Sequence, residues 1–113
     1  MKGVYIFLAN GFEEMEALAP LDILRRGGVD VKTVSIHRDK FVTGSHKATV
    51  VADMTYDEFK AGVQLDGTDE MDTIIFPGGM PGTKHLAESS EIINLLQDTL
   101  SELKSIKKHL DLL

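Results

Sequence analysis

The residues best suited to chemistry lie in a glycine- and proline-rich loop at positions 77–83. The loop follows the short apolar run 73–76, which predicts a strand buried on both faces. Gly78 and Gly79 permit backbone angles that other residues resist, and a loop just after a parallel strand is where open α/β sheets bind ligands. The sequence therefore indicates a ligand-binding loop. A plain strand-to-helix turn is an equally good interpretation, because glycine and proline are ordinary turn residues.

The histidines give little indication of a metal site. His37, His46, His85 and His109 are far apart along the chain, whereas zinc ligands usually occur in closely spaced pairs. We therefore expect neither a metal nor another cofactor. The polar loop that holds His46 could approach the ligand-binding loop at 77–83, and the His46 ring could then bind an anion. The alternative, which is commoner for a loop histidine, is a ring in solvent.

Nucleophilic serines and phosphate loops are also poorly indicated. Ser45, Ser89, Ser90 and Ser101 stand outside any nucleophile-elbow motif, so a Ser/His/Asp triad is not expected. The loop at 78–82 lacks the Gly-Lys-Ser/Thr ending of a P-loop, and it does not match the dinucleotide fingerprint. Phosphate binding at the start of the next helix is a weak alternative.

Length and composition exclude several classes of protein. A chain of 113 residues with 42% hydrophobic and 27% charged residues is expected to form one globular domain. The net charge of −6 argues against nucleic acid or an anionic membrane as partner. No apolar run is long enough to span a membrane, and no signal peptide is expected. The absence of cysteine excludes disulfides and thiolate catalysis within the chain, and the cytoplasm is the expected compartment.

The elements that must position the loop begin with a strand–helix–strand unit. Residues 4–8 are apolar and predict a buried strand, and residues 29–36 alternate as a second strand. Between them a helix is expected from Glu13 and Glu14 to the glycines at 27–28, with a kink or an irregular first turn at Pro20.

The rest of the chain predicts smaller elements and one long helix. Segments 41–42 and 49–52 predict a hairpin. Residues 53–59 predict one or two helical turns, with Thr55 as the N-cap and Glu58 three residues after it. Residues 62–70 predict a surface loop, and 83–87 a short helix. An apolar stripe predicts a helix over 90–109, which either packs on the core or forms an interface. We therefore expect an α/β, flavodoxin-like three-layer sandwich with a mainly parallel sheet.

Three stretches together resemble the amino-terminal half of the ThiJ/PfpI superfamily, which includes the Parkinson disease protein deglycase type and is related to class I glutamine amidotransferases. They are GFEEMEA at 11–17, with the residues that follow it to Gly28; VTGSH at 42–46, followed by Ala52 and Asp53; and DTIIFPGGMPGT at 72–83. The resemblance covers residues 2 to about 100.

The resemblance implies a parallel sheet with helices on both faces, homodimers, and a catalytic cysteine on a strand-to-helix elbow. It implies glyoxalase, deglycase, chaperone or protease activity for the full-length family. It also implies that Glu16 is the carboxylate that hydrogen-bonds the cysteine sulfur, and that Gly79 supplies a backbone N–H to an oxyanion-type pocket. The sequence pattern alone favours Glu16 as a surface acid.

The chain departs from the family pattern after about Leu100, where residues 101–113 predict a divergent helical tail in place of the cysteine elbow. We therefore expect a single partial domain over 1–113, truncated before the nucleophile strand, whose activity on small carbonyl compounds is absent or very low. The alternative is a non-enzymatic domain that binds itself or a partner. The missing strand would leave the edge of strand 73–76 open, so we expect a dimer through that edge or through the long helix.

Overall fold

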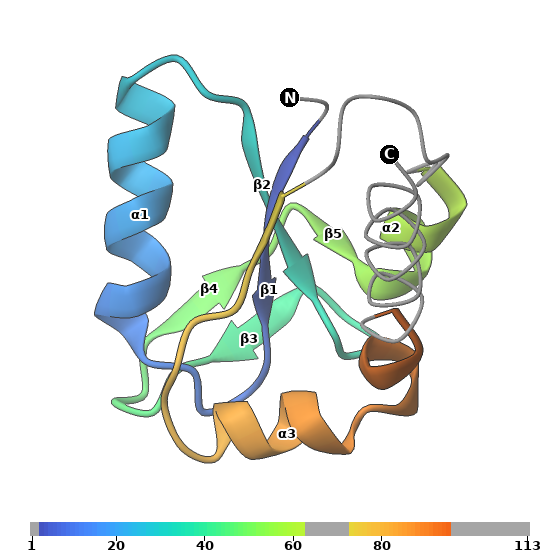
Figure 1. Ribbon diagram of the computed structural model, residues 1–113. Coiled ribbons are helices and arrows are strands. Elements are labelled where there is room, and N and C mark those ends of the chain that lie inside the picture. The colour runs from blue at the N-terminus through green and yellow to red at the C-terminus, as the bar shows by residue number, and fades with distance from the viewer. Residues whose placement is uncertain (1–2, 63–72, 96–113) are drawn as a thin grey trace, which may run out of the picture.

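A parallel four-stranded sheet forms the centre of the computed structural model, which describes residues 3–62 and 73–95 (Figure 1). Its order is β5 (Met54–Thr55), β2 (Val31–Ser35), β1 (Val4–Leu8) and β6 (Thr73–Ile75). All three neighbouring pairs run parallel, with Val4 of β1 opposite Val31 and Thr73. The surface loop expected at 62–70, most of the helix expected over 90–109 and the tail at 101–113 lie outside the described residues.

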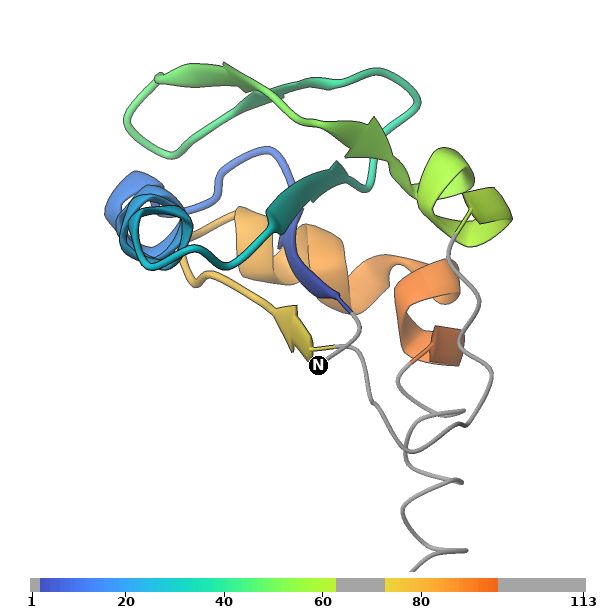
Figure 2. The ribbon, with the colours of Figure 1, turned by 90° about the horizontal axis from the view of Figure 1, so that it is seen from above.

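Helices cover both faces of this sheet (Figure 2). Helix α1 (Glu14–Arg26) lies on one face, and α2 (Tyr56–Gly62) lies on the other with the helical residues 90–95. Helix α3 (Gly82–Glu88) runs across the carboxyl ends of the strands (Figure 1). A separate antiparallel hairpin is formed by β3 (Phe41–Thr43) and β4 (Thr49–Val51). These layers confirm the α/β, flavodoxin-like three-layer sandwich with a mainly parallel sheet.

The side chains of β1 alternate between two hydrophobic clusters, one under each layer of helices. Phe7 packs with residues of α2, α3 and the 90–95 segment, whereas Ile6 and Leu8 pack with Phe12 and Ala17 on the α1 side. Ile6, Phe7 and Leu8 are fully buried. The prediction of a buried first strand is thus confirmed, and β1 is the strand that joins the two halves of the core.

Strand β6 is less buried than the sequence predicts. Thr73 is exposed, Ile74 and Ile75 are half-buried, and Phe76 is 38% exposed. The expectation of burial on both faces is wrong here because, in the part of the chain that the structure describes, β6 pairs with β1 only and so lies at the edge of the sheet. A strand in that position is covered by neighbours on one side alone.

Helix α1 begins and ends at the expected residues. The Glu13 side chain caps it by accepting a hydrogen bond from the Glu16 N–H at 2.9 Å, and Gly27 caps its carboxyl end. The helix continues as one element through Pro20. An acidic first turn and the arginines of the last turn complement the helix dipole.

The smaller elements agree with prediction in type and differ in extent. The capping box is confirmed, because the Glu58 N–H donates to Thr55 Oγ1 at 3.3 Å and the Thr55 N–H donates to Glu58 Oε1 at 3.4 Å. Helix α2 starts after that cap and ends at Gly62 rather than 59. Strand β5 was not predicted, since two residues carry no periodic signal. Its pairing with β2 depends on tertiary contacts.

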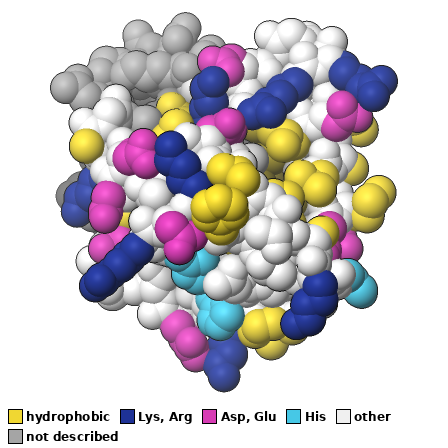
Figure 3. Space-filling model, turned by 180° about the vertical axis from the view of Figure 1, so that it is seen from behind, with side chains coloured by type: hydrophobic (Ala, Val, Ile, Leu, Met, Phe, Trp, Pro, Cys, Tyr) yellow, Lys and Arg dark blue, Asp and Glu magenta, His cyan; other side chains and the backbone are white. Residues whose placement is uncertain are grey.

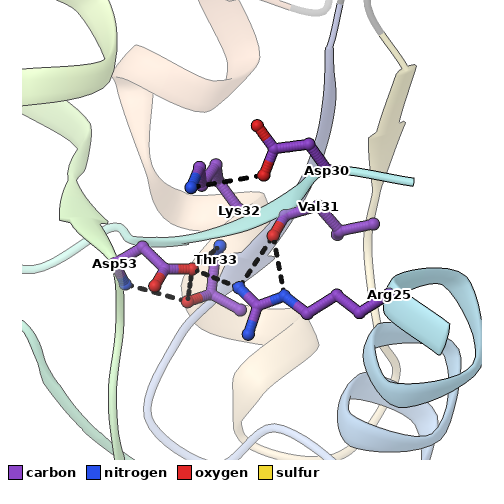
Figure 4. A network of polar contacts seen from close by, with 6 residues as sticks. All are labelled: Arg25, Asp30, Val31, Lys32, Thr33 and Asp53. Atoms are coloured by element: carbon purple, nitrogen blue, oxygen red, sulfur yellow. Dashed lines mark hydrogen bonds and ion pairs between the residues drawn. The ribbon is translucent and has the colours of Figure 1, made fainter. Parts of the chain in front are cut away.

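A polar network joins the end of α1 to the sheet (Figure 4). The Arg25 guanidinium donates to the Val31 carbonyl at 2.7 Å and to Asp53 Oδ2 at 2.8 Å. Asp53 Oδ2 also accepts the Thr33 N–H at 2.8 Å and the Thr33 hydroxyl at 3.0 Å. Partial burial raises the pKa of Asp53, but the hydrogen bonds from Thr33 and the charge of Arg25 outweigh this effect and lower it.

Replacing Asp53 by alanine should lower the free energy of unfolding by about 1–2 kcal/mol, because the buried Thr33 N–H loses its acceptor. The matched control is Asp22→Ala, which breaks an exposed ion pair with Arg26 and should cost less than about 0.5 kcal/mol. Urea unfolding of both variants measures the difference. A loss at Asp53 no larger than that at Asp22 would contradict this account of the network.

Candidate functional site

The candidate site lies where the carboxyl ends of β1 and β6 meet the start of α1 (Figure 1). The chain leaves β1 through the turn at Asn10 and Gly11, and leaves β6 through the loop at 76–81. The Glu13 N–H donates to the Gly78 carbonyl at 2.8 Å, which holds the loop against the first turn of α1. The loop predicted from its glycines and prolines is therefore at the position where parallel sheets bind ligands.

Glu16 reaches this loop. The Gly78 N–H donates to Glu16 Oε1 at 3.3 Å, and a Cβ at position 78 would lie 2.9 Å from the same oxygen. The Glu16 side chain is exposed. The structure thus brings together Glu16 and the glycine loop, which lie 62 residues apart in the sequence.

Gly79 has a backbone conformation that favours glycine, with φ of +100°. A Cβ at this position would also collide with the Glu13 N–H and lie 2.9 Å from the Gly11 carbonyl oxygen. The Gly79 carbonyl accepts the Thr83 N–H at 2.8 Å as α3 begins. The oxyanion role expected for the Gly79 N–H stays a prediction.

Glu14 is the residue that sequence reasoning missed. Its carboxylate accepts the His46 N–H at 2.9 Å, the Ala48 N–H at 3.2 Å and the Ser45 hydroxyl at 3.3 Å, all from the turn of the β3–β4 hairpin. The side chain is only 12% exposed. Glu14 therefore ties α1 to the hairpin. Its partners are mostly backbone amides, which leave no signal in the sequence.

This set of contacts controls the ionisation of Glu14. Burial raises the pKa of its carboxyl group, but the N–H groups of Glu14 itself, Ala48 and His46 outweigh burial and lower the pKa to about 2. Ligand atoms of Glu13, Glu14 and His46 lie within 4.8 Å of one another. Glu14 already accepts several hydrogen bonds and Glu13 caps α1, so these groups have structural roles.

The other predicted candidates are dispersed. His46 lies on the hairpin turn beside Glu14, with its ring exposed. His37 and His85, distant in sequence, contact the same residue, Asn10. Ser89 caps the helical segment at 90–95, where its hydroxyl oxygen accepts the Ile92 N–H at 3.4 Å. His109 and Ser101 lie outside the described residues.

Comparisons with known proteins agree with this geometry. A family model described as the DJ-1/PfpI family matches residues 2–107. The chain is 31% identical over 98 residues to the Parkinson disease protein 7 homolog of Danio rerio, covering 86% of this chain and 48% of that protein. It is 37% identical over 76 residues to the Deglycase TK1284 of Thermococcus kodakarensis, covering 67% of this chain and 41% of that protein.

This chain belongs to the DJ-1/PfpI family.

The fold agrees with solved structures of the DJ-1 type. A mutant of a DJ-1 superfamily protein from Salmonella typhimurium is 36% identical and superposes with a TM-score of 0.74, over 87% of this chain and 49% of that one. The chain thus spans about half the length, or less, of the DJ-1/PfpI relatives it matches. Within residues 3–62 and 73–95, no helix is long and apolar enough to cross a membrane.

Glu14 should make the free energy of unfolding of this DJ-1/PfpI chain depend on pH in the acid range. Its folded pKa of about 2 lies below the ordinary value of 4.5, so its contribution is complete above pH 4.5 and is lost as pH falls toward 2. Glu14→Gln should therefore be destabilised near neutral pH, and its deficit relative to wild type should narrow between pH 4.5 and 2. Denaturant unfolding across this range measures the deficit.

The control for this prediction is Glu88→Gln, which removes an exposed acid paired with Lys84 at 3.9 Å. Its free energy of unfolding should stay close to wild type throughout. A Glu14→Gln deficit that stayed constant with pH would mean that the hairpin contacts do not depend on the charge of Glu14.

Proposed function

We propose that this chain provides the carboxylate and backbone part of a DJ-1/PfpI-type site for small carbonyl compounds, and that the 113-residue chain alone has absent or very low turnover. In this proposal Glu16 hydrogen-bonds the thiol of a cysteine nucleophile, and the Gly79 N–H faces the oxygen that becomes negative during reaction. The observation that carries the proposal is the contact of the Gly78 N–H with Glu16 Oε1 at 3.3 Å.

The local chemistry supports these roles. Glu16 is exposed, and the Gly78 N–H from the loop after β6 donates to it. A carboxylate there can accept a hydrogen bond from a thiol. It cannot replace the nucleophile, and the 113-residue sequence contains no cysteine. A relative named as a deglycase makes carbonyl chemistry the fitting class.

The chain should show no turnover of methylglyoxal above the rate in buffer, and Glu16→Gln should be indistinguishable from wild type. The physical reason is that no thiolate is present to attack the carbonyl. Product formation monitored by absorbance and NMR tests this. Turnover by the wild-type chain that Glu16→Gln abolishes would require a different nucleophile.

Ligand binding at the proposed site can be measured even if the chain has no turnover. Titration with a small carbonyl compound should shift the amide signals of Gly78 and Gly79 in NMR spectra, and Glu16→Gln should weaken that binding severalfold. Glu88→Gln, on the exposed side of α3, should leave it unchanged. Equal shifts in Glu16→Gln and wild type would remove Glu16 from the proposed site.

The edge position of β6 favours a second candidate function, a domain that associates with itself or a partner. In the described residues β6 pairs on one side only, and Phe76 is 38% exposed next to it. Edge strands readily pair with another chain. This candidate includes the expected dimer, formed through the strand edge or through the carboxyl-terminal helix.

Wild-type protein should therefore sediment as a dimer or larger species in analytical ultracentrifugation. Thr73→Lys, which adds charge to the edge strand, should shift the distribution toward monomer if the edge is the interface. Thr83→Lys, at an exposed position of α3, is the matched control and should have no effect. A wild-type chain that stays monomeric at every concentration would contradict the association.

A further inference from the structure

Two histidines from different elements hold the backbone of Asn10 from both sides. The Asn10 N–H donates to His37 Nε2 at 2.9 Å, and His85 Nδ1 lies 2.7 Å from the Asn10 carbonyl oxygen. His37 follows β2, and His85 lies in α3. Their ring centroids are 6.3 Å apart with the planes at 82°. Histidine side chains gather on the face of the molecule shown in Figure 3.

The hydrogen bonds define where the ring protons lie. His37 Nε2 accepts an N–H and so carries a lone pair, which requires a neutral ring with its proton on Nδ1. A carbonyl oxygen can only accept, so His85 Nδ1 donates to Asn10. Protonation affects the two bonds differently. An imidazolium His85 keeps its donor, whereas an imidazolium His37 has two donors and cannot accept the Asn10 N–H.

The turn that these histidines hold also supports the candidate site. The Gly11 carbonyl accepts the Gly82 N–H at 3.1 Å at the start of α3. The Gly11 N–H donates to the Thr43 carbonyl at 2.8 Å, and Asn10 Oδ1 accepts the Thr43 N–H at 3.0 Å. The same turn packs against Gly79. A shift of the Asn10 backbone would therefore reach the loop, α3 and the hairpin.

We propose that His37 and His85 form a pH-sensitive clamp on the Asn10–Gly11 turn, closed while His37 is neutral and released on the His37 side when that ring is protonated. The histidines act as positioning residues for the glycine loop. The clamp depends on hydrogen bonds within the described chain and is independent of any chemistry at the site, so it can hold whether or not the proposed carbonyl function does.

The groups around His37 set the direction of the effect. Partial burial lowers the pKa of His37 from its ordinary value of 6.5, the neighbouring His85 lowers it further, and Asp39 in the same loop raises it. The folded protein thus binds this proton less readily than the unfolded chain. The contribution of neutral His37 to the free energy of unfolding is therefore complete above pH 6.5. This contribution is lost as pH decreases through the folded pKa of His37, where the clamp opens.

NMR spectroscopy of the full chain tests the clamp. Long-range ¹⁵N spectra near pH 8 should show His37 with a protonated Nδ1 and an unprotonated Nε2. On acidification to about pH 5 the amide signals of Asn10, Gly11 and Gly79 should move together with one midpoint below 6.5. The protection factor of the Asn10 amide, which is the intrinsic exchange rate at the same pH divided by the observed rate, should fall about tenfold. If the wild-type spectrum near pH 8 shows His37 with its proton on Nε2, the proposal is overturned.

Two substitutions complete the test. His37→Gln offers a side-chain oxygen as acceptor that does not titrate, so the shared midpoint of the amide signals should disappear and the protection factor of Asn10 should stay high. His37→Phe removes the acceptor and should give a low protection factor at Asn10 at every pH. His46→Gln, at an exposed position of the hairpin, is the matched control and should retain the wild-type titration. An unchanged Asn10 midpoint in His37→Gln would overturn the clamp.

Discussion

The candidate site depends on a direct approach of backbone to backbone between the turn after β1 and the loop after β6. A Cβ at Gly82 would lie 2.7 Å from the Phe12 nitrogen and 2.8 Å from the Gly11 carbonyl oxygen, and one at Gly79 would meet the Glu13 N–H. Hydrogen bonds from Glu13 to Gly78 and from Gly82 to Gly11 hold the two segments together. Because side chains are excluded from this contact, Glu16 and the Gly78 N–H can meet.

The sequence predicted those elements whose position depends on their own residue types. The apolar run at 4–8 predicted the buried strand β1, and the acidic start and the glycine stop at Gly27 predicted the ends of α1. Strand β6 shows the limit of this reasoning. Its residues are as apolar as a central strand requires, yet its burial depends on which strands pair with it, and the described sheet places it at an edge.

The candidate site was predictable only where its signal lay in residue types. The glycine loop and Glu16 could be singled out by their family resemblance, and the structure brings them together. The partners of Glu14 are backbone amides 32 and 34 positions away, which any residue could supply. His37 and His85 lie 27 and 75 positions from the residue they hold. These contacts arise from topology, so neither spacing nor composition could indicate them.

The three glutamates at the start of α1 have different roles because they meet different numbers of donors. Glu13 caps its own helix, and Glu14 accepts several hydrogen bonds from the hairpin in a largely buried position. From the described residues Glu16 accepts one long hydrogen bond, at 3.3 Å, and its side chain is exposed. A carboxylate has about four acceptor positions. Glu16 therefore retains the capacity to bind another donor, which Glu14 has largely used, and this difference makes Glu16 the carboxylate suited to a ligand or a thiol.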